Sequence, residues 1–257
     1  MTIDSEIILS IITVSFNSVD TIIDTLDSVA SQTFTKYEHI VIDGNSTDGT
    51  IDILKSYSSP NLTFISEADD GIYYAMNKGI KLAKGKYIAI LNSDDFFKDN
   101  EVLERLIAIF EKDGADIVYS GIEFINAKQA VIAEWMPDFF VKNFYRRGYN
   151  TPHPGFFATQ NLYAELGLFD ISMPIAADFD LMFRFMENAK TKCVRWPVVT
   201  VVMRSDGTSS SIKNIFQGHR DIFRAFGKEN LAISIIPYMI RRYLPKLKRK
   251  LTTMINK

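Results

Sequence analysis

Residues 87–95 read Tyr-Ile-Ala-Ile-Leu-Asn-Ser-Asp-Asp, an apolar run that passes directly into two neighbouring carboxylates. Short apolar runs of this kind are typical of strands that are buried on both faces. In open sheets whose strands alternate with helices, ligands bind beyond the carboxyl ends of the strands. The stretch therefore predicts a buried strand over residues 87–91 that delivers Asp94 and Asp95 to a binding edge.

The chain before this stretch alternates between the sequence periods of strands and helices. We expect strands at residues 7–16, 37–42 and 62–66, and helices at residues 21–32, 50–57 and 72–83. This alternation within about a hundred residues predicts right-handed crossovers and a largely parallel sheet. Each strand is followed by a polar loop that contains Asp or Asn, so these loops should gather at one edge of the sheet.

The second half of the chain is less regular. We expect helices at residues 100–112, 161–166 and 178–187, and strands at residues 116–124, 131–135, 156–159 and 193–203. From residue 215 onward the pattern is helical, with a break at Pro237. We therefore expect one α/β domain over residues 1–214, in two halves that meet near residue 99, followed by a helical segment over residues 215–257.

Composition limits the classes of protein that fit. The chain has 257 residues, of which 47% are hydrophobic and 23% charged, so it can bury a large core. The net charge of −2 gives no signal for nucleic acid. The single cysteine, Cys193, excludes an internal disulfide and favours a reducing compartment. No signal peptide is apparent and no run of about 18 apolar residues occurs, which predicts a cytoplasmic protein.

The last residues are basic, whereas the rest of the chain is acidic. Residues 230–257 contain seven Lys or Arg and no acidic residue, while the remainder has 22 basic and 31 acidic residues. Apolar residues recur between these basic residues at nearly helical spacing. A basic amphipathic helix over residues 233–257 is typical of peripheral contact with an anionic membrane, here the inner face of the cell membrane. The alternative is a helix that packs on the body with a solvated basic face.

Two common nucleotide-binding motifs are absent. No Gly-x-Gly-x-x-Gly follows the first strand, and no P-loop lysine motif occurs, which argues against a dinucleotide oxidoreductase and a P-loop NTPase. The remaining local signal is Asn92-Ser93-Asp94-Asp95. Hard divalent cations take oxygen ligands, so carboxylates at the end of a strand suit Mg²⁺ together with substrate phosphates. The alternative is that Asp95 or Asp99 simply caps the next helix.

Five motifs follow one another at regular intervals. They are Thr-Val-Ser-Phe-Asn at 13–17, Asp-Gly-Asn-Ser-Thr-Asp-Gly-Thr at 43–50, Asp-Gly-Ile-Tyr at 70–73, Ala-Met-Asn-Lys-Gly at 75–79 and Leu-Asn-Ser-Asp-Asp at 91–95. Together they resemble the family 2 glycosyltransferases with the GT-A fold, especially bacterial enzymes that build exopolysaccharide, capsule and O-antigen. The resemblance covers about residues 7–210. It implies a mostly parallel central sheet flanked by helices, with a nucleotide-sugar half at 1–99 and an acceptor half at 100–214.

The resemblance implies roles for residues in the first half. Thr13 and Ser15 would lie beside the nucleotide base, Asp43 would hydrogen-bond that base, and Asp70 and Gly71 would lie near the base or the ribose. Together with Asn92, Asp94 and Asp95, these five residues would form the donor site.

The same resemblance assigns the acidic stretch after the fourth strand. Asn92-Ser93-Asp94 occupies the family's Asp-x-Asp position, so Asp94 would bind Mg²⁺ or Mn²⁺ and bridge it to the diphosphate. Asn92 is a poorer metal ligand than the usual aspartate but can hydrogen-bond a hydroxyl group. Asp95 would orient the sugar or support Asp94.

A sixth motif, at residues 176–184, resembles the family's acidic catalytic motif and implies that Asp178 is the general base. A carboxylate at the start of a helix is favoured in its ionised form, which suits this role. The alternative is that Asp178 only caps the helix. Asp180 is expected to pair with Arg184 four residues later.

His153 lies between two prolines in Thr151-Pro152-His153-Pro154-Gly155, and a fixed backbone is unusual for a merely solvated histidine. The resemblance implies a position on the acceptor side, with acceptor contact and metal binding both open. Residues 205–209 resemble the loop that closes over the donor, and a surface turn is the alternative.

The resemblance therefore implies an inverting, metal-dependent transfer of a sugar from a nucleotide-diphospho-sugar, with UDP as the expected nucleotide because uracil is the commonest base in the family. The acceptor would be a hydroxyl of a glycan or of a lipid-linked saccharide. The alternatives are a catalytically impaired nucleotide-sugar-binding protein and a sugar-1-phosphate nucleotidylyltransferase. The latter would need a basic, Gly-rich loop after the first strand, and residues 15–20 contain neither Gly, Arg nor Lys.

Overall fold

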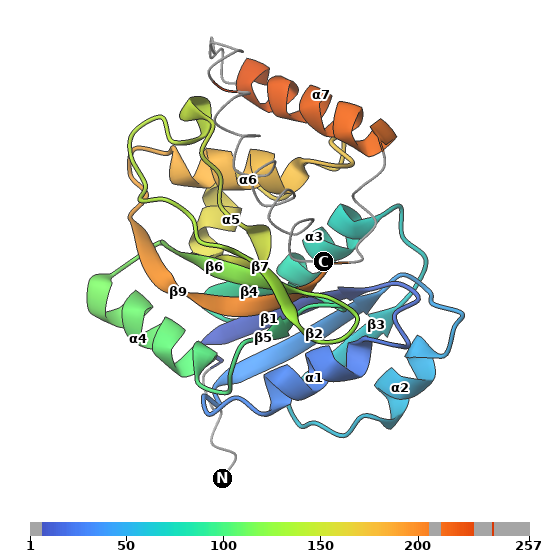
Figure 1. Cartoon of the computed structure of the whole chain (residues 1–257). Coiled ribbons are helices and arrows are strands. Elements are labelled where there is room, and N and C mark those ends of the chain that lie inside the picture. Colours follow the sequence, from blue (N-terminus) through green and yellow to red (C-terminus); the bar gives the residue numbers. More distant parts are fainter. Residues whose placement is uncertain (1–6, 206–211, 229–237, 239–257) are drawn as a thin grey trace.

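A computed structural model describes residues 7–205 and 212–228 together with Tyr238, and shows one curled sheet with helices on both faces (Figure 1). The strands are β1 (Leu9–Ser15), β2 (Tyr37–Asp43), β3 (Leu62–Ser66), β4 (Tyr87–Asn92), β5 (Phe96–Phe97), β6 (Ile117–Ile125), β7 (Val131–Trp135), β8 (Phe156–Thr159) and β9 (Cys193–Arg204). The α-helices are α1 (Ile22–Ala30), α2 (Thr50–Ser56), α3 (Ile72–Leu82), α4 (Val102–Asp113), α5 (Gln160–Leu166), α6 (Ala177–Met186) and α7 (Ile212–Lys228). Two 3-10 turns lie at Tyr145–Arg147 (η1) and His153–Gly155 (η2).

The sheet has the strand order β3-β2-β1-β4-β8-β6-β9-β5, with β7 paired to β6. The strands β1 to β4 are parallel to one another, as the strand–helix alternation predicts. The second half is mixed, because β8 runs antiparallel to both β4 and β6, whereas β6 and β9 are parallel. The two-residue strand β5 was not predicted, since it is too short to show a period and depends on its partner β9.

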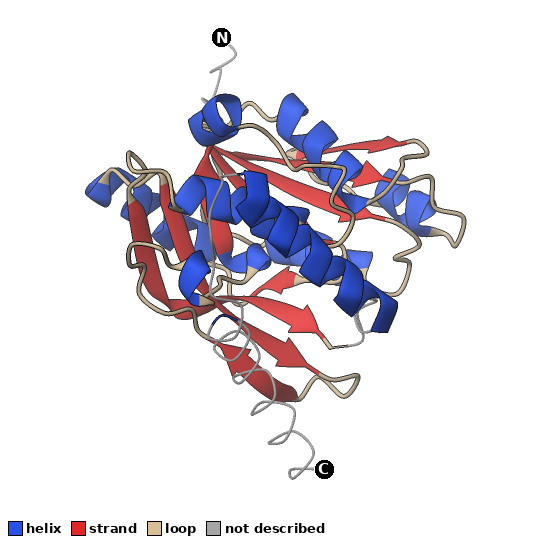
Figure 2. Ribbon diagram, turned by 90° about the horizontal axis from the view of Figure 1, so that it is seen from above, coloured by secondary structure: helices blue, strands red, loops and turns tan. Residues whose placement is uncertain are grey.

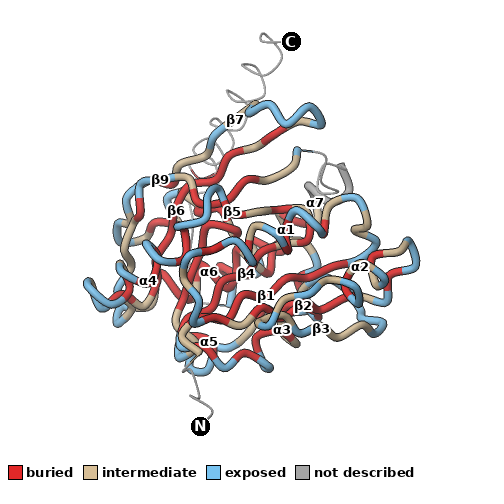
Figure 3. The backbone as a smooth tube through the Cα atoms, turned by 90° about the horizontal axis from the view of Figure 1, so that it is seen from below, coloured by how far each residue is buried: buried red, intermediate tan, exposed pale blue. Residues whose placement is uncertain are grey.

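Buried apolar residues form one core on each face of the sheet, and Figures 2 and 3 show these layers from above and below. The larger core packs α3, α5, α6 and α7 against one face, and the smaller one packs α4 and part of α1 against the other. All seven residues of β1 are buried, since both faces of this strand are covered. The apolar runs in the sequence reflect this double burial.

The register of the parallel strands determines where their ends lie. Ser15 at the end of β1 is level with Asp43 at the end of β2, and Val14 is level with Asn92 at the end of β4. The polar loops that follow these strands therefore meet at one edge of the sheet.

The helix α7 packs on α6 and belongs to the larger core. The ring of Phe226 lies 5.6 Å from that of Phe179 and 5.2 Å from that of Phe183. The predicted boundary between residues 214 and 215 falls inside this helix. The predicted loop at 205–209 and the predicted basic segment at 233–257 lie outside the described residues, apart from Ser205 and Tyr238.

In the part of the chain that the structure describes, no helix has the length and apolar character needed to cross a bilayer. Cys193 is a free thiol, as predicted.

Candidate active site

A cleft of about 710 Å³ opens at the edge where β1, β2 and β4 end. Its walls come from the ends of β1, β4 and β9 and from the loops after β2 and β3. The lining residues include Ser15, Gly44, Asp69, Gly71, Asn92 and Asp94. We call this cavity the donor cleft, because four of these six residues belong to the predicted donor site.

Hydrogen bonds between the loops after β1 and β2 fix one wall of the donor cleft. The backbone N–H of Asn17 donates to Ser46 Oγ at 2.8 Å, and the N–H of Thr47 donates to Asn17 Oδ1 at 2.9 Å. Asn17 itself has a φ of 49°, a left-handed conformation that asparagine tolerates better than most residues. The turn-forming residues of both loops thus produce an ordered wall.

Asp43 stabilises the loop after β2, which forms part of this wall. Its side chain is fully buried, and its carboxylate accepts hydrogen bonds from Ser46 N at 2.9 Å, Ser46 Oγ at 2.5 Å and Ser66 Oγ at 2.7 Å. Both carboxylate oxygens are therefore engaged within the protein. The predicted hydrogen bond between Asp43 and the base stays a prediction.

Thr13 is not among the residues that line the donor cleft, and its predicted place beside the base stays a prediction. Its side chain is fully buried, and its Oγ1 lies 2.9 Å from His39 Nε2 in a hydrogen bond between β1 and β2. Burial lowers the pKa of His39 to about 3, so this imidazole is neutral at pH 7. Thr13 and His39 form a structural pair inside the sheet.

Three buried polar atoms beside the donor cleft have no hydrogen-bond partner among the described residues. They are Ser15 Oγ, Asn92 Oδ1 and Asp95 Oδ1. Buried polar atoms in native proteins are usually paired, so unpaired ones call for an explanation. Ser15 and Asn92 both line the donor cleft, where a ligand can supply the missing hydrogen bonds.

Asp94 and Asp95 differ in exposure. Asp94 is partly exposed and lines the donor cleft, whereas Asp95 is fully buried beneath it. Asn92 Nδ2 donates to Asp95 Oδ2 at 3.0 Å. Burial, and after it the neighbouring charge of Asp94, raises the pKa of Asp95 well above its ordinary value. Of the two predicted roles for Asp95, support of Asp94 fits this position.

Only one of the two donor residues expected after β3 lines the donor cleft. Gly71 lies in the lining with a φ of 127°, a conformation that favours glycine. Asp70 is exposed and is not part of the lining, so its predicted place near the base or the ribose stays a prediction. Its neighbour Asp69 lies there instead, and Asp69 Oδ1 accepts the N–H of Gly71 at 2.9 Å.

Sequence reasoning also missed two residues of the donor cleft. Phe16 has 65% of its surface exposed and lies against Gly44, where an added Cβ would come within 3.2 Å of the ring. Arg204, at the end of β9, donates to the backbone oxygen of Asp94 at 2.8 Å and pairs with Asp24. An exposed aromatic residue directly after a buried strand was the available signal for Phe16. Nothing local marks Arg204, because its partners are more than a hundred residues away.

The residues predicted for catalysis lie together on the other side of α3. Asp178 is in the first turn of α6, and Tyr73 Oη lies 3.3 Å from Asp178 Oδ1. The ring of Tyr73 stacks on Phe169 at 5.4 Å, and the His153 ring packs edge-on against Phe169 at 5.7 Å. Burial lowers the pKa of His153, and the charge of Asp178 only partly opposes this, so His153 is neutral at pH 7.

The predicted pairing within α6 is confirmed. Arg184 Nε donates to Asp180 Oδ2 at 2.8 Å, and Asp180 is only 1% exposed. Arg184 also donates to the backbone oxygens of Leu166 and, at 2.8 Å, Leu168. This ion pair therefore joins α6 to the end of α5.

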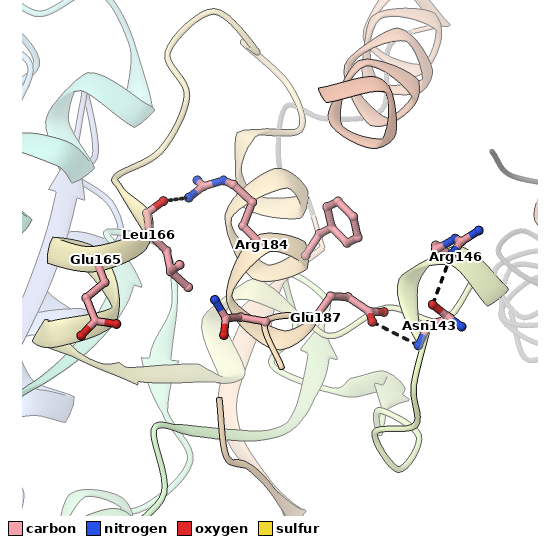
Figure 4. A pocket seen from close by; sticks show the side chains of 8 residues that line it. Asn143, Arg146, Glu165, Leu166, Arg184 and Glu187 are labelled. Carbon is pink, nitrogen blue, oxygen red and sulfur yellow. Dashed lines mark hydrogen bonds between the residues drawn. The ribbon is translucent and has the colours of Figure 1, made fainter. Parts of the chain in front are cut away.

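A second pocket, of about 490 Å³, lies between α5, the end of α6 and η1, and Figure 4 shows its side chains. We call it the α6 pocket. Its charged groups bond to the protein: Glu187 accepts the N–H groups of Asn143 and Tyr145, both at 3.1 Å, and Arg184 is engaged as described. None of the described side chains that line the α6 pocket has an unpaired buried polar atom, although Asp180 Oδ1, on the partner of Arg184, is one.

No group of three or more His, Cys, Asp or Glu side chains in the described ranges is arranged to hold a metal ion by itself. Mg²⁺, however, commonly uses one or two carboxylates together with substrate phosphates. Asp94 supplies a carboxylate, and the unpaired Asn92 Oδ1 supplies a second oxygen. These residues fit a divalent cation that binds together with a diphosphate.

The sheet is parallel in its first half and mixed in its second half, and an acidic cleft lies at the ends of its strands. A second acidic side chain, Asp178, lies on the other side of α3. These features are typical of GT-A glycosyltransferases. The sequence profile of the glycosyl transferase family 2 matches residues 10–168, and the chain belongs to this family.

Individual relatives agree with this assignment. A PGL/p-HBAD biosynthesis glycosyltransferase of Mycobacterium tuberculosis is 28% identical over 228 residues, which cover 86% of this chain and 85% of that protein. The structure of S. aureus TarS 1-349 in complex with UDP-GlcNAc has a TM-score of 0.71 at 19% identity, covering 92% of this chain and 72% of that one. The mannosyltransferase PcManGT from Pyrobaculum calidifontis, in complex with GDP-Man and Mn²⁺, has a TM-score of 0.63 at 18% identity, covering 96% and 73%.

Proposed function

We propose that this chain is an inverting glycosyltransferase that moves a sugar from a nucleotide-diphospho-sugar to a hydroxyl group of a glycan or lipid-linked saccharide, in the synthesis of a cell-surface polysaccharide. One observation carries the proposal. Tyr73 directly follows Gly71 and Ile72, which line the donor cleft, and its hydroxyl lies 3.3 Å from Asp178. A carboxylate suited to general-base catalysis is thus one hydrogen bond away from a wall of the donor cleft.

The proposed donor is a UDP-hexose or a UDP-N-acetylhexosamine. The exposed ring of Phe16 offers a face on which a base can stack, and Ser15 Oγ offers an unpaired hydroxyl beside it. Arg204 places a positive charge at the same edge as Asp94, where a diphosphate would be attracted. The UDP-GlcNAc complex of TarS, which shares the fold, supports this choice of donor.

We propose Mg²⁺ or Mn²⁺ as the cofactor, held by Asp94 with help from Asn92. A bound divalent cation would neutralise negative charge on the leaving diphosphate. The Mn²⁺ in the PcManGT complex supports the proposal by likeness of fold. Because Asn92 replaces a carboxylate, metal affinity in the absence of nucleotide should be low.

In the proposed reaction the acceptor hydroxyl attacks the anomeric carbon of the donor sugar. The new bond between the acceptor oxygen and C1 forms as the bond between C1 and the phosphate oxygen breaks, and the nucleoside diphosphate leaves with the electron pair. Asp178 takes the proton from the acceptor hydroxyl. Attack from the face opposite the leaving group inverts the configuration at C1. His153 is neutral and lies beside Asp178, which suits a hydrogen bond to the acceptor.

The test begins with a thermal-shift screen of UDP-, GDP- and dTDP-sugars in the presence of Mg²⁺ or Mn²⁺, since ligands that bind the native state raise its melting temperature. With the donor so identified, Asp178→Asn should lower turnover by about 10²- to 10⁴-fold, the usual contribution of a general base, and keep the thermal shift. Asp94→Ala should abolish the shift. Wild-type turnover by the Asp178→Asn variant would refute the assignment.

The same assay separates the alternatives. A catalytically impaired binding protein would show the thermal shift and release the donor intact, whereas the proposed enzyme hydrolyses it slowly to free sugar and nucleoside diphosphate. A nucleotidylyltransferase would instead form a nucleotide-sugar from a nucleoside triphosphate and a sugar 1-phosphate. The loop after β1 lacks the basic residues expected for that reaction.

We also propose that residues 233–257 hold the enzyme against the inner face of the cell membrane, beside a lipid-linked acceptor. The support is the charge of that segment, which is basic without any acidic residue. Co-sedimentation with vesicles that contain phosphatidylglycerol, but not with pure phosphatidylcholine vesicles, would agree with it. Equal recovery with both vesicles would contradict it.

A further inference from the structure

The short segment that leads into α6, residues 175–178, is held by side chains from two other helices. From α3, Tyr73 Oη donates to the backbone oxygen of Ile175 at 3.1 Å and lies 3.3 Å from Asp178 Oδ1. From α7, Asp221 Oδ2 accepts the N–H groups of Ile175 at 3.1 Å and Ala176 at 3.3 Å. The start of α6 is therefore clamped between α3 and α7.

The clamp compensates for a missing cap. The first N–H groups of a helix have no partner inside the helix, and a polar residue at the N-cap usually satisfies one of them. The N-cap of α6 is Ala176, whose side chain cannot do so. Asp221, which is 2% exposed, takes over this function from another helix, and Gln217 fixes its second oxygen at 2.7 Å.

We infer that Tyr73 is a positioning residue for Asp178 and that Asp221 fixes the backbone at residues 175 and 176, just before it. Through Tyr73, the donor cleft and the base are held in a fixed position relative to each other. The inference rests on the proposed function, in which Asp178 is the base. It adds two residues to that function, one from the donor half and one from α7.

The side chain of Tyr73 is held in place by its neighbours. Its ring stacks on Phe169 with an interplanar angle of 24°, which leaves the hydroxyl little freedom. Burial, together with the charge of Asp178, keeps the pKa of Tyr73 well above its ordinary value, so the hydroxyl remains a hydrogen-bond donor. The contact of Tyr73 is with Oδ1 of Asp178 and does not use Oδ2. One carboxylate oxygen is thus held by Tyr73, and the other is available to take a proton.

The first turn of α3 connects this contact to the donor cleft. The N–H groups of Tyr74 and Ala75 donate to the backbone oxygen of Gly71 at 2.9 and 3.3 Å, so the turn is closed from its first residue. Gly71, Ile72 and Ala75 line the donor cleft, while Tyr73 lies between them in sequence and faces Asp178. A donor that contacts this turn therefore contacts the element that orients the base.

Tyr73→Phe in the full chain removes the hydroxyl and keeps the stacking ring. With the donor identified above and water as acceptor, we expect kcat to fall about three- to tenfold, the worth of one hydrogen bond in the transition state. The donor KM and the melting temperature should stay close to wild type. The matched control is Tyr57→Phe, which removes a tyrosine–aspartate hydrogen bond of 2.7 Å, to Asp27, that lies outside the lining of the donor cleft. It should leave kcat unchanged.

A double-mutant cycle tests whether Tyr73 acts through Asp178. In the Asp178→Asn background, Tyr73→Phe should lower the residual turnover by less than about twofold, because its partner is already lost. Asp221→Asn removes the charge at the start of α6 and keeps the size of the side chain. It should likewise lower the residual turnover of Asp178→Asn by less than about twofold, and it replaces Tyr73→Phe if that variant does not fold.

The outcomes separate the inference from the proposed function. Full turnover by Asp178→Asn alone would refute the base, whatever Tyr73 does. If Asp178→Asn is inactive but Tyr73→Phe retains the wild-type kcat, only the positioning inference fails. It fails as well if Tyr73→Phe lowers turnover equally in both backgrounds, or if it raises the donor KM at unchanged kcat.

Discussion

The donor cleft and the α6 pocket both contain carboxylates and amides, yet the hydrogen bonding of these groups differs. Beside the donor cleft, Ser15 Oγ and Asn92 Oδ1 are buried without a partner among the described residues. In the α6 pocket, Arg184 bonds to Asp180 and to two backbone oxygens, and Glu187 accepts two backbone N–H groups. From this difference we infer that the paired groups of the α6 pocket serve stability, whereas Ser15 and Asn92 can each form a hydrogen bond with a ligand in the donor cleft.

The largest expected effect is on stability, in the α6 pocket. Arg184→Met would leave Asp180 buried, with Lys228, 3.6 Å away, as its one remaining ion-pair partner among the described residues. We expect the free energy of unfolding, measured with urea, to fall by about 3 kcal/mol, as for other broken buried ion pairs, while the donor KM stays unchanged. The matched control is Arg105→Met, whose pair with Asp99 is exposed and should be worth less than about 1 kcal/mol. An unchanged unfolding free energy in Arg184→Met would break the comparison.

A smaller effect is expected from pH, at the Thr13–His39 pair beneath the donor cleft. The pKa of His39 is lowered to about 3 in the folded chain, against 6.5 for the free side chain. The unfolded state therefore binds the extra proton first, and stability falls as the pH drops from 6.5 towards 3. Between pH 7 and pH 5 the loss from this group should be about 2 kcal/mol. His39→Gln should flatten that part of the curve of unfolding free energy against pH, and an identical slope in both proteins would contradict the assignment.

The smallest effects come from two hydroxyls two residues apart on β1, and they sharpen the comparison most. Ser15→Ala removes an unpaired hydroxyl and should weaken UDP binding about fivefold, measured by calorimetry with Mn²⁺, without loss of stability. Thr13→Val removes a paired one and should cost about 1 kcal/mol of stability without changing UDP affinity. If the two variants behave alike, hydrogen-bond pairing does not distinguish binding residues from structural ones in this fold.

Much of the fold could be predicted from the sequence, because the information is local. The buried strands show as apolar runs, and the loop that contains Asp43 shows as a cluster of turn formers. The pairing of Asp180 with Arg184 follows from helical spacing alone. The mixed second half of the sheet was less predictable, since the direction of β8 depends on contacts with strands that are distant in sequence.

The donor site was predictable in outline and not in detail. A motif places Thr13 and Ser15 together, but only the structure shows that Ser15 lines the donor cleft, whereas Thr13 bonds to His39 inside the sheet. Asp69 and Asp70 are equivalent in sequence, and the turn at Gly71 decides which of them faces the donor cleft. Arg204 and Asp221 contact groups far away along the chain, so no local pattern announces them.

The cap that Asp221 provides for α6 also has a meaning for the order in which the chain is made. A polypeptide is synthesised from the N-terminus to the C-terminus, and its first parts can fold before the last parts have been made. The parallel strands β1 to β4 and the wall around Asp43 come from the first hundred residues. The backbone that carries Asp178 receives its cap only after residue 221 has been added, and Asp94 receives its bond from Arg204 almost as late. A fragment that ends before Arg204 therefore lacks the bond to Asp94, and one that ends before Asp221 lacks the bonds to the backbone at the start of α6.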